Sequence, residues 1–304
     1  MIEAMIVSIA IKKEVLIMNI KHSISKILPD SVYLKIKFKR IMGRPLNLKN
    51  PKFFNDKLQW LKLHDHNPVY ISLVDKFEVK KIIADMLGNE YIIPTLGVWN
   101  SFDEIDFNQL PDRFVLKCTH DSGGVVICKN KNKFDFTKAG EKINEHLKHN
   151  YYWTGREWPY KHIPHKIIAE QYMEDEKTGS LDDYKLFCFD GVVDNIMVVR
   201  GRANGKPKYY HFDKDWNLCR FNRLTRALPL DFCEEKPPFI DRMIEIAEII
   251  SKGFPHVRID LYEANGCIYF GEFTLYNQSG WETGFDEYSD SYLGSLIHLP
   301  GERE

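Results

Sequence analysis

The chain has 304 residues, of which 44% are hydrophobic, 13% aromatic and 28% charged, with a formal net charge of −1 at pH 7. This composition excludes an intrinsically disordered, collagen-like or disulfide-scaffold protein, and the length allows a large core in two or three lobes. A net charge near zero argues against a nucleic-acid binder that depends on overall basic charge, so no nucleic-acid partner is expected.

The N-terminal part, residues 1–50, is predicted to be a basic extension. Its longest apolar run, residues 4–11, is too short to span a membrane and lacks the basic flank of a signal peptide, and Met18 is an alternative start. Residues 21–50 contain eight lysines and arginines but one acid, Asp30. Interleaved apolar residues make this stretch suited either to peripheral contact with an anionic membrane or to a solvated helical face.

Residues 51–111 are predicted to form a helical and mixed lobe. A first helix is expected over about 55–63, with Asn55 or Asp56 as its cap. A second helix is expected through 73–86 because apolar residues recur at intervals of three and four, and Gly88 would end it. Residues 91–98 are typical of a short buried strand with a proline break.

Residues 112–170 are predicted to form a small α+β lobe. Apolar runs at 114–118 and 125–128 flank a loop containing glycine, which indicates a hairpin. A polar helix over about 137–149 and a strand over 167–172 follow.

Residues 171–304 are predicted to form a C-terminal lobe of antiparallel hairpins. Strands are expected at 184–189 and 192–199, joined at Asp190-Gly191, and at 257–262 and 267–273, joined at Asn265-Gly266. Shorter strands at 208–212 and 216–219 and an amphipathic helix over 241–252 complete it. The fold class that these elements predict is α+β, with mostly antiparallel sheets.

Two stretches carry residue types that suit phosphate and metal chemistry. Arg258, Asp260 and Glu272 lie on the last predicted hairpin, where two carboxylates on one sheet face suit Mg²⁺, although ordinary surface charges would give the same spacing. Lys117 ends an apolar strand before Ser122, Gly123 and Gly124, whose backbone N–H groups could cradle phosphate oxygens, although a plain glycine hairpin has the same composition.

Together with three further segments, these stretches resemble the ATP-grasp superfamily. Asp75-Lys76-x-x-x-Lys80 resembles the segment of the first nucleotide lysine, residues 114–128 the phosphate-covering hairpin, and residues 168–173 the adenine-binding hinge. Asp183-x-Lys185 is similar to the D-x-R strand of peptide-forming members. Arg258-x-Asp260 with Glu272-x-Thr274 is similar to the R-x-D…E-x-N metal signature.

The resemblance is closer to one branch, the TupA-like (teichuronopeptide-biosynthesis) ATP-grasp family of bacterial surface-polysaccharide proteins. It covers about residues 45–300 and is carried by the phrases NPKFFNDKLQWLKL, FVLKCTHDSGGVVICKN, NYYWTGREWPY and VRIDLY…YFGEFT. It implies two α+β lobes whose antiparallel sheets enclose ATP, preceded by a helical N-terminal region. It also implies a cytoplasmic ligase that uses ATP and Mg²⁺ to join a small-molecule carboxylate, such as a uronic acid, to an amine through an acylphosphate.

The resemblance assigns the site residue by residue. ATP would be bound by Lys76, Lys117, Ser122, Gly123, Gly124, Glu170, Tyr172, Met173 and Asp183; the metal by Asp260, Glu272 and Thr274; and Arg258 and Lys185 would be catalytic. Two positions depart from the family pattern. Thr274 replaces the asparagine of E-x-N, a place that Asn277 could take if its loop folds back, and Lys185 replaces an arginine and lacks its bidentate fork.

Two other classes of function stay open from the sequence. One is a glycosyltransferase of polysaccharide biosynthesis that uses a sugar nucleotide, although Asp213-Lys-Asp215 is typical of a turn rather than of a metal-binding D-x-D. The other is a non-catalytic nucleotide-binding partner. The residues of Arg156-Glu157-Trp158 suit either an acceptor subsite or a packed lid. The scattered cysteines, with no C-x-x-C pair, indicate reduced thiols.

Overall fold

The computed structural model describes residues 26–177, 179, 181–200 and 207–301, and the chain divides into two units, residues 1–47 and residues 48–304. The apolar run at 4–11 and the alternative start at Met18 lie outside the described residues. Across the described residues, no helix combines the length and the apolar character that crossing a bilayer requires. The four-part division into 1–50, 51–111, 112–170 and 171–304 stays a prediction.

The first unit contains one described helix, α2 (Asp30–Met42). Asp30 in its first turn and Lys39 and Arg40 in its last turn complement the helix dipole, and Gly43, at φ 72°, ends it in the left-handed conformation. Ile36 is 58% exposed beside the exposed Lys35. Basic and apolar side chains therefore share the surface of α2, as both interpretations of this stretch require.

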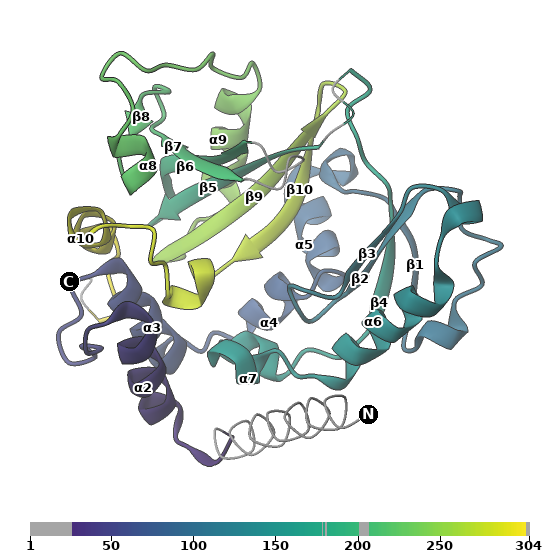
Figure 1. The fold of residues 1–304 in the computed structure, drawn as a ribbon, viewed down its shortest axis with the longest axis horizontal. Helices are drawn as coiled ribbons and strands as arrows, with labels where there is room; N and C mark the ends of the chain where they lie inside the picture. The colour runs from purple at the N-terminus through teal and green to yellow at the C-terminus, as the bar shows by residue number, and fades with distance from the viewer. Residues whose placement is uncertain (1–25, 178, 180, 201–206, 302–304) are drawn as a thin grey trace, which may run out of the picture. The chain divides into compact units, whose positions relative to one another are not determined.

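The second unit is built around a six-stranded antiparallel sheet in the order β10-β9-β5-β6-β7-β8 (Figure 1). Its strands are β5 (Asp182–Phe189), β6 (Val192–Arg200), β7 (Lys208–Phe212), β8 (Leu218–Cys219), β9 (His256–Ala264) and β10 (Cys267–Thr274). The predicted hairpin turns are present: both residues of Asp190-Gly191 and of Asn265-Gly266 have positive φ, as a two-residue turn of this twist requires.

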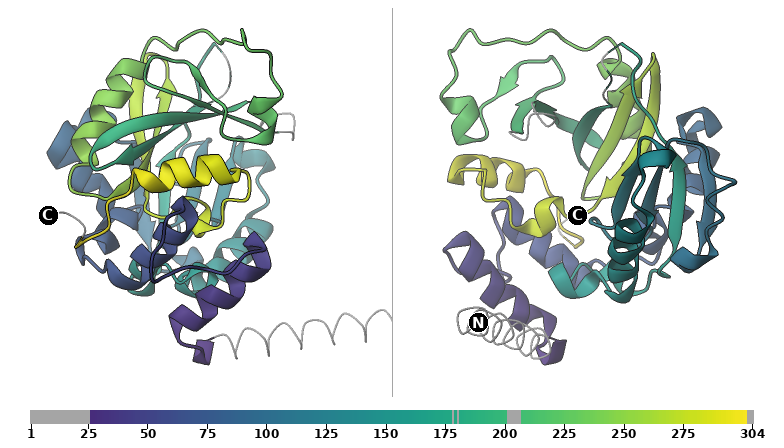
Figure 2. Two further views of the ribbon diagram at one scale, coloured as in Figure 1. Left: turned by 90° about the vertical axis from the view of Figure 1, so that its left-hand side faces the viewer. Right: turned by 45° about the vertical axis from the view of Figure 1, so that its right-hand side comes forward.

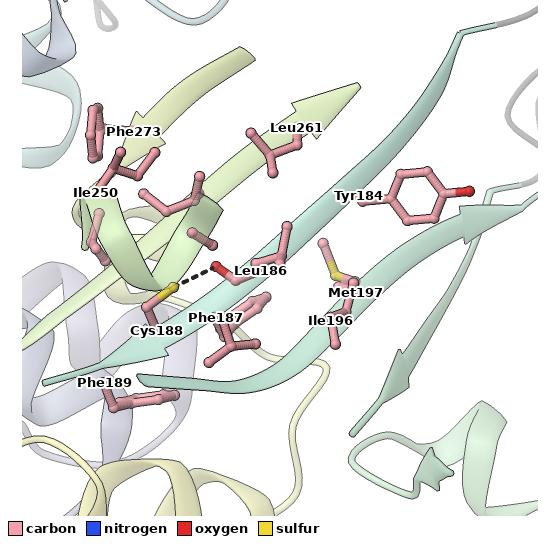
Figure 3. Packing of buried hydrophobic residues seen from close by; sticks show 14 of the residues in the cluster. Tyr184, Leu186, Phe187, Cys188, Phe189, Ile196, Met197, Ile250, Leu261 and Phe273 are labelled. Carbon is pink, nitrogen blue, oxygen red and sulfur yellow. Dashed lines mark hydrogen bonds between the residues drawn. The ribbon is translucent and has the colours of Figure 1, made fainter. Parts of the chain in front are cut away.

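Side chains of β5 alternate between the two faces of this large sheet. Leu186 and Cys188 belong to a buried cluster with Ile250 of α9 (Ile240–Ile250), a helix that packs against β5 and β6 (Figure 3). All six cysteines lie within the described chain, and none is in a disulfide. The opposite face of β5 carries Asp183 and Lys185, which leaves it for the polar residues of the site.

A second sheet has four antiparallel strands in the order β1-β4-β2-β3. Its strands are β1 (Thr95–Trp99), β2 (Phe114–Cys118), β3 (Val125–Cys128) and β4 (Ile167–Gln171), and α6 (Phe136–Lys148) packs against β2 and β3 (Figure 2). This small sheet has a hydrophobic cluster of its own, which includes Phe114, Leu116 and Ile143. Its edge strand β1 comes from before residue 112, ahead of the predicted small lobe.

The remaining helices connect and flank the sheets. They are α3 (Phe54–His64), α4 (Val69–Val74), α5 (Glu78–Leu87), α7 (Tyr152–Gly155), α8 (Arg223–Arg226) and α10 (Glu287–Ser295), with 3₁₀ turns at Asn89–Tyr91, Phe102–Glu104, Lys131–Lys133, Trp158–Lys161 and Asn277–Gly280.

Two helical predictions are wrong. Asn55 and Asp56 lie inside α3 and do not cap it, because Asn55 instead bonds the C-terminal segment through Asp290 and Glu282. The helix predicted through 73–86 is two helices, α4 and α5. The carboxylate of Asp75 accepts hydrogen bonds from the backbone N–H groups of Phe77 and Glu78 and so starts a new helix.

We expect Gly294→Ala to destabilise the protein although alanine is the better helix former. A Cβ at Gly294 of α10 would lie 2.2 Å from the carbonyl oxygen of Lys52 and 2.6 Å from the backbone nitrogen of Phe54, and backbone atoms cannot move aside cheaply. The expected loss is about 1–3 kcal/mol in urea-induced unfolding. The exposed Ser291→Ala on the same helix is the control, and equal stability of both variants would contradict this packing.

We expect buried His256 to make the protein acid-sensitive. Burial lowers its pKa from 6.5 to about 3, and it is packed between Phe54 and Phe189 with Nδ1–H donating to the carbonyl of Cys188. Between these two values the unfolded chain binds a proton that the folded chain does not. The contribution of His256 to stability is therefore constant above pH 6.5 and falls as pH drops below it, by up to about 1.4 kcal/mol per pH unit.

His256→Phe should remove that one-proton contribution to the slope of unfolding free energy between pH 6.5 and 4.5. The exposed His149→Phe is the control. An unchanged slope in His256→Phe would contradict the assignment.

Candidate functional site

A cavity of about 730 Å³ lies between the small and the large sheet. Of the predicted site residues it is lined by Lys76, Lys117, Ser122, Glu170, Tyr172, Met173 and Glu272. Its apolar wall includes Ile93, Val115 and Phe270, so one side suits a flat apolar ring and another suits charged groups. Four of the five sequence segments that carry the resemblance to the ATP-grasp superfamily therefore meet at this cavity, and Asp183-x-Lys185 is not in its lining.

Asp121 fixes the conformation of the loop that follows β2. Its carboxylate accepts a hydrogen bond from the backbone N–H of Gly124 at 3.0 Å and contacts Nδ1 of His146, while Nζ of Lys76 donates to its carbonyl. A Cβ at Gly123 would lie 2.7 Å from His146, and one at Gly124 would lie 2.7 Å from Sγ of Cys118. The two glycines are therefore required by close packing, and Ser122 stays exposed at the cavity.

The histidine in this loop, His120, is part of the packing. Its ring is fully buried and stacks on His165 at a centroid distance of 3.7 Å. Burial, with the neighbouring His165, lowers the pKa of His120 to about 4, which leaves it neutral near pH 7. Its Nε2 lies 3.2 Å from the carbonyl oxygens of His146 and His149.

Glu170 at the end of β4 organises the positive charges of the cavity. It is 5% exposed and forms ion pairs with Lys117 at 2.6 Å and with Lys80. Burial opposes ionisation of Glu170, but the charges of Lys117 and Lys80 outweigh it and hold its pKa below the usual value. Lys80 was not among the site residues assigned from the sequence, although its spacing of four from Lys76 was part of the quoted motif.

The large sheet carries a row of paired residues along one face. Cross-strand pairing joins Glu272 of β10 to Asp260 of β9, Asp260 to Lys185 of β5, Lys185 to Met197 of β6, and Met197 to His211 of β7. Directly opposed residues in an antiparallel sheet point to the same face. A register shift at Gly271 places Glu272 opposite Asp260, and a Cβ at Gly271 would lie 2.9 Å from the carbonyl oxygen of Asp260.

Asp260 is the centre of the charged part of this row. It is 1% exposed, accepts hydrogen bonds from Nε and Nη2 of Arg258 at 2.6 and 2.8 Å, and pairs with Lys185. Burial opposes its ionisation, but Arg258 and Lys185 outweigh burial and keep its pKa low. Lys185 also pairs with Asp183 at 2.9 Å. The sheet thus brings together four of the predicted residues in one network.

The side chains around Arg258 carry oxygens of the types that Mg²⁺ binds, from Asp260, Glu272, Thr274 and Asn277. Nη2 of Arg258 donates to Oγ1 of Thr274 at 3.0 Å and Nη1 donates to Oδ1 of Asn277 at 2.7 Å, while Glu272 lies 3.4 Å away. The loop after β10 has therefore folded back so that Asn277 reaches the same cluster as Thr274. In the described chain no three His, Cys, Asp or Glu side chains gather as a metal site. Mg²⁺ usually needs only one or two protein carboxylates and completes its shell with phosphate oxygens and water.

Helix α3 holds the turn that carries Asn277. Nε2 of Gln59 donates to the carbonyls of Ser279 and Gly280, and Nζ of Lys62 donates to the carbonyl of Ser279 at 2.7 Å. Within this turn Gln278 and Ser279 have φ of 46° and 54°, a conformation that non-glycine residues adopt only at a cost. This support was not predicted from the sequence, where its signal is the spacing of polar Asn55, Gln59 and Lys62 along one helix face.

The segment Arg156-Glu157-Trp158 is packed rather than open. Arg156 is 1% and Glu157 6% exposed, the guanidinium of Arg156 lies 4.4 Å from the ring centroid of Trp153, and Trp158 stacks on His66. The burial of this segment therefore favours the packed lid over the acceptor subsite.

The sequence model described as TupA-like ATPgrasp matches residues 56–298. The chain therefore belongs to the TupA-like ATP-grasp family, which confirms the fold class and identifies it as an ATP-grasp enzyme. The expected cofactors, ATP and Mg²⁺, agree with this family. No curated protein sequence matches the chain significantly.

Solved structures match parts of the chain at low identity. The D-alanine–D-alanine ligase from Bacillus anthracis complexed with ATP has a TM-score of 0.44 and 15% identity, over 74% of this chain and 63% of that one. The D-alanine–D-alanine ligase from Helicobacter pylori has a TM-score of 0.42 and 15% identity, over 81% and 69%. The D-cycloserine synthetase DcsG has a TM-score of 0.41 and 16% identity, over 76% and 71%.

We expect Lys62→Met to loosen the turn at 277–280. Methionine keeps most of the volume but removes the hydrogen bonds that Lys62 donates to Gly155 and Ser279, and leaves their carbonyls buried without that donor. Amide hydrogen exchange of residues 277–282 should become at least about tenfold faster. The exposed Lys81→Met is the control. Unchanged exchange in Lys62→Met would show that α3 does not hold the turn.

Proposed function

We propose that this protein is an ATP- and Mg²⁺-dependent carboxylate–amine ligase. The proposal rests on two neighbouring features. One is the cavity lined by Lys76, Lys117 and Glu272, and the other is the Arg258–Asp260 network, which lies beside Glu272 on the same face of the large sheet. The family supports ATP as the co-substrate. Glycine-loop cations facing paired carboxylates are the arrangement that phosphoryl transfer to a bound nucleophile requires.

The proposed reaction has two steps. An oxygen of the substrate carboxylate attacks the γ-phosphorus of ATP, the bond from that phosphorus to the β,γ-bridging oxygen breaks, and ADP leaves with an acylphosphate formed. The nitrogen of an amine then attacks the acyl carbon, the carbon–oxygen bond to phosphate breaks, and the nitrogen loses a proton as the amide forms.

The side chains act by position and charge. Lys76, Lys117 and the backbone of Ser122, Gly123 and Gly124 would bind the phosphates, while Tyr172 and Met173 at the end of β4 would line the adenine side. Glu170 would act mainly by fixing Lys80 and Lys117, since its carboxylate is paired with both. Arg258 would stabilise the negative charge on the acyl oxygen, and Lys185, positioned by Asp183, would hold Asp260 ionised.

Asp260 and Glu272, with Thr274 or Asn277, would hold Mg²⁺. When bound there, the metal would neutralise phosphate oxygens during transfer. Asn277 offers an amide carbonyl and Thr274 a hydroxyl, and both already lie in the cluster around Arg258.

The substrates and the setting belong to the same proposal. We take a uronic acid or similar sugar acid as the carboxylate, a small amine as its partner, and bacterial surface or capsular polysaccharide biosynthesis as the process, because the family resemblance implies them. The requirement for ATP favours the cytoplasm, and the basic surface of α2 suits at most peripheral contact with an anionic membrane.

We expect Glu272→Gln to lower ADP release at least about a hundredfold in a screen of uronic acids and small amines. The same variant should lose the extra thermal stabilisation that wild type gains from ATP with Mg²⁺ over ATP with EDTA. The control is Glu263→Gln, whose side chain points to the opposite face of neighbouring β9.

Undiminished ADP release in Glu272→Gln would overturn the ligase assignment. Stabilisation of wild type by UDP-sugars and not by ATP with Mg²⁺ would favour the glycosyltransferase. That alternative has little geometric support, because Asp213 of its Asp-Lys-Asp motif is engaged with Asn217 in the β7–β8 turn.

A further inference from the structure

We propose that a second cavity, on the same face of the large sheet, is the pocket for the amine substrate, and that this amine also carries an anionic group. The cavity has a volume of about 410 Å³ and is lined by residues of β6, β7, α8 and the C-terminal segment, among them Met197, Tyr209, His211, Phe285 and Glu282. The inference rests on the proposed ligase function and adds a site and a substrate class to it.

The cavity lies at the far end of the row that crosses the large sheet. Met197 and His211 line it, and each is a direct cross-strand partner in the row that continues through Lys185 and Asp260 to Glu272. Neighbouring strands are about 4.8 Å apart, so His211 on β7 is about 10 Å from Lys185 on β5. The ATP cavity and this second cavity therefore occupy opposite ends of one row, with Asp260 and Lys185 between them.

A hydrogen-bonded path joins the second cavity to the candidate catalytic arginine. Glu282 lines the cavity, its side chain is hydrogen-bonded with Asn277, and Asn277 accepts from Nη1 of Arg258. Gln278, which also lines the cavity, belongs to the left-handed turn that Gln59 and Lys62 hold. Strained backbone that is fixed by several buried side chains is a feature of functional sites.

The charges of the lining define what the pocket binds. At the end joined to Arg258, the carboxyl of Glu282 suits an amine. On α8, Arg223 is an exposed cation of the lining, and it forms no ion pair with another described residue. The aromatic residues Tyr209 and Phe285 also line the cavity. A ligand with an amine at one end and a carboxylate or phosphate at the other matches this layout, and binding it would point the nitrogen toward the acyl centre.

The test compares ligands that differ only in the anionic group. Full-length protein is saturated with a non-hydrolysable ATP analogue and Mg²⁺ and then titrated calorimetrically with two pairs: alanine against alaninamide, and glucosamine 6-phosphate against glucosamine. We expect the anionic ligand of one pair to bind, and the neutral ligand of the same pair to bind at least about tenfold more weakly. Arg223→Gln should weaken binding of the anionic member about tenfold and leave binding of the ATP analogue unchanged.

The matched control is Lys214→Gln, an exposed lysine outside the cavity lining, which should bind both ligands as wild type does. Arg223→Gln changes an exposed side chain, so folding should survive, and the melting temperature checks this. If wild type fails to bind the ATP analogue with Mg²⁺, the proposed function fails. If it binds the analogue but no amine of the panel, or if Arg223→Gln binds the amine as wild type does, the second pocket is wrong and the ligase proposal stands.

Discussion

The structure of the site depends on one buried carboxylate, Asp260, held between Arg258 and Lys185. A carboxylate that is 1% exposed is tolerated only with full compensation, and here two cations on two neighbouring strands supply it. This requirement constrains the pairing of β5, β9 and β10, because a slip of one residue would turn the partners of Asp260 to the opposite face. The bulge at Gly271 brings a second carboxylate, Glu272, opposite Asp260, and Arg258 lies close to both.

The charge balance at Asp260 also explains why distant segments are attached to the site. Arg258 has more donors than Asp260 can accept, and it directs one to Asn277 in a turn that is itself held by α3. Helix α3 lies 217 to 221 residues earlier in the chain, and its buried Gln59 and Lys62 hold that turn. The part of the sequence before the two sheets thus acts as a support for the C-terminal loop.

The two sheets divide the chemistry between them. The small sheet contributes Lys117, together with Glu170, which holds it at one wall of the ATP cavity. The large sheet contributes Glu272 and the adjoining Arg258–Asp260 network. Glu170 shows how geometry refines a role drawn from family resemblance. The resemblance places it beside the adenine, and in the structure both of its oxygens are engaged with lysines.

The sequence by itself determined the local and motif-level features: the fold class, strands such as β2 and β3, the Asp190-Gly191 and Asn265-Gly266 turns, and the segments that meet at the cavity. These follow from side-chain periodicity, turn chemistry and long motifs, which are local properties. Only the tertiary structure decided that Asn55 bonds Asp290 instead of capping α3, that Lys80 joins Glu170, and that Met197 and His211 extend the charged row to a second cavity. These contacts join residues that are far apart in the chain or on neighbouring strands, and hydrophobic spacing carries no information about which of them become neighbours.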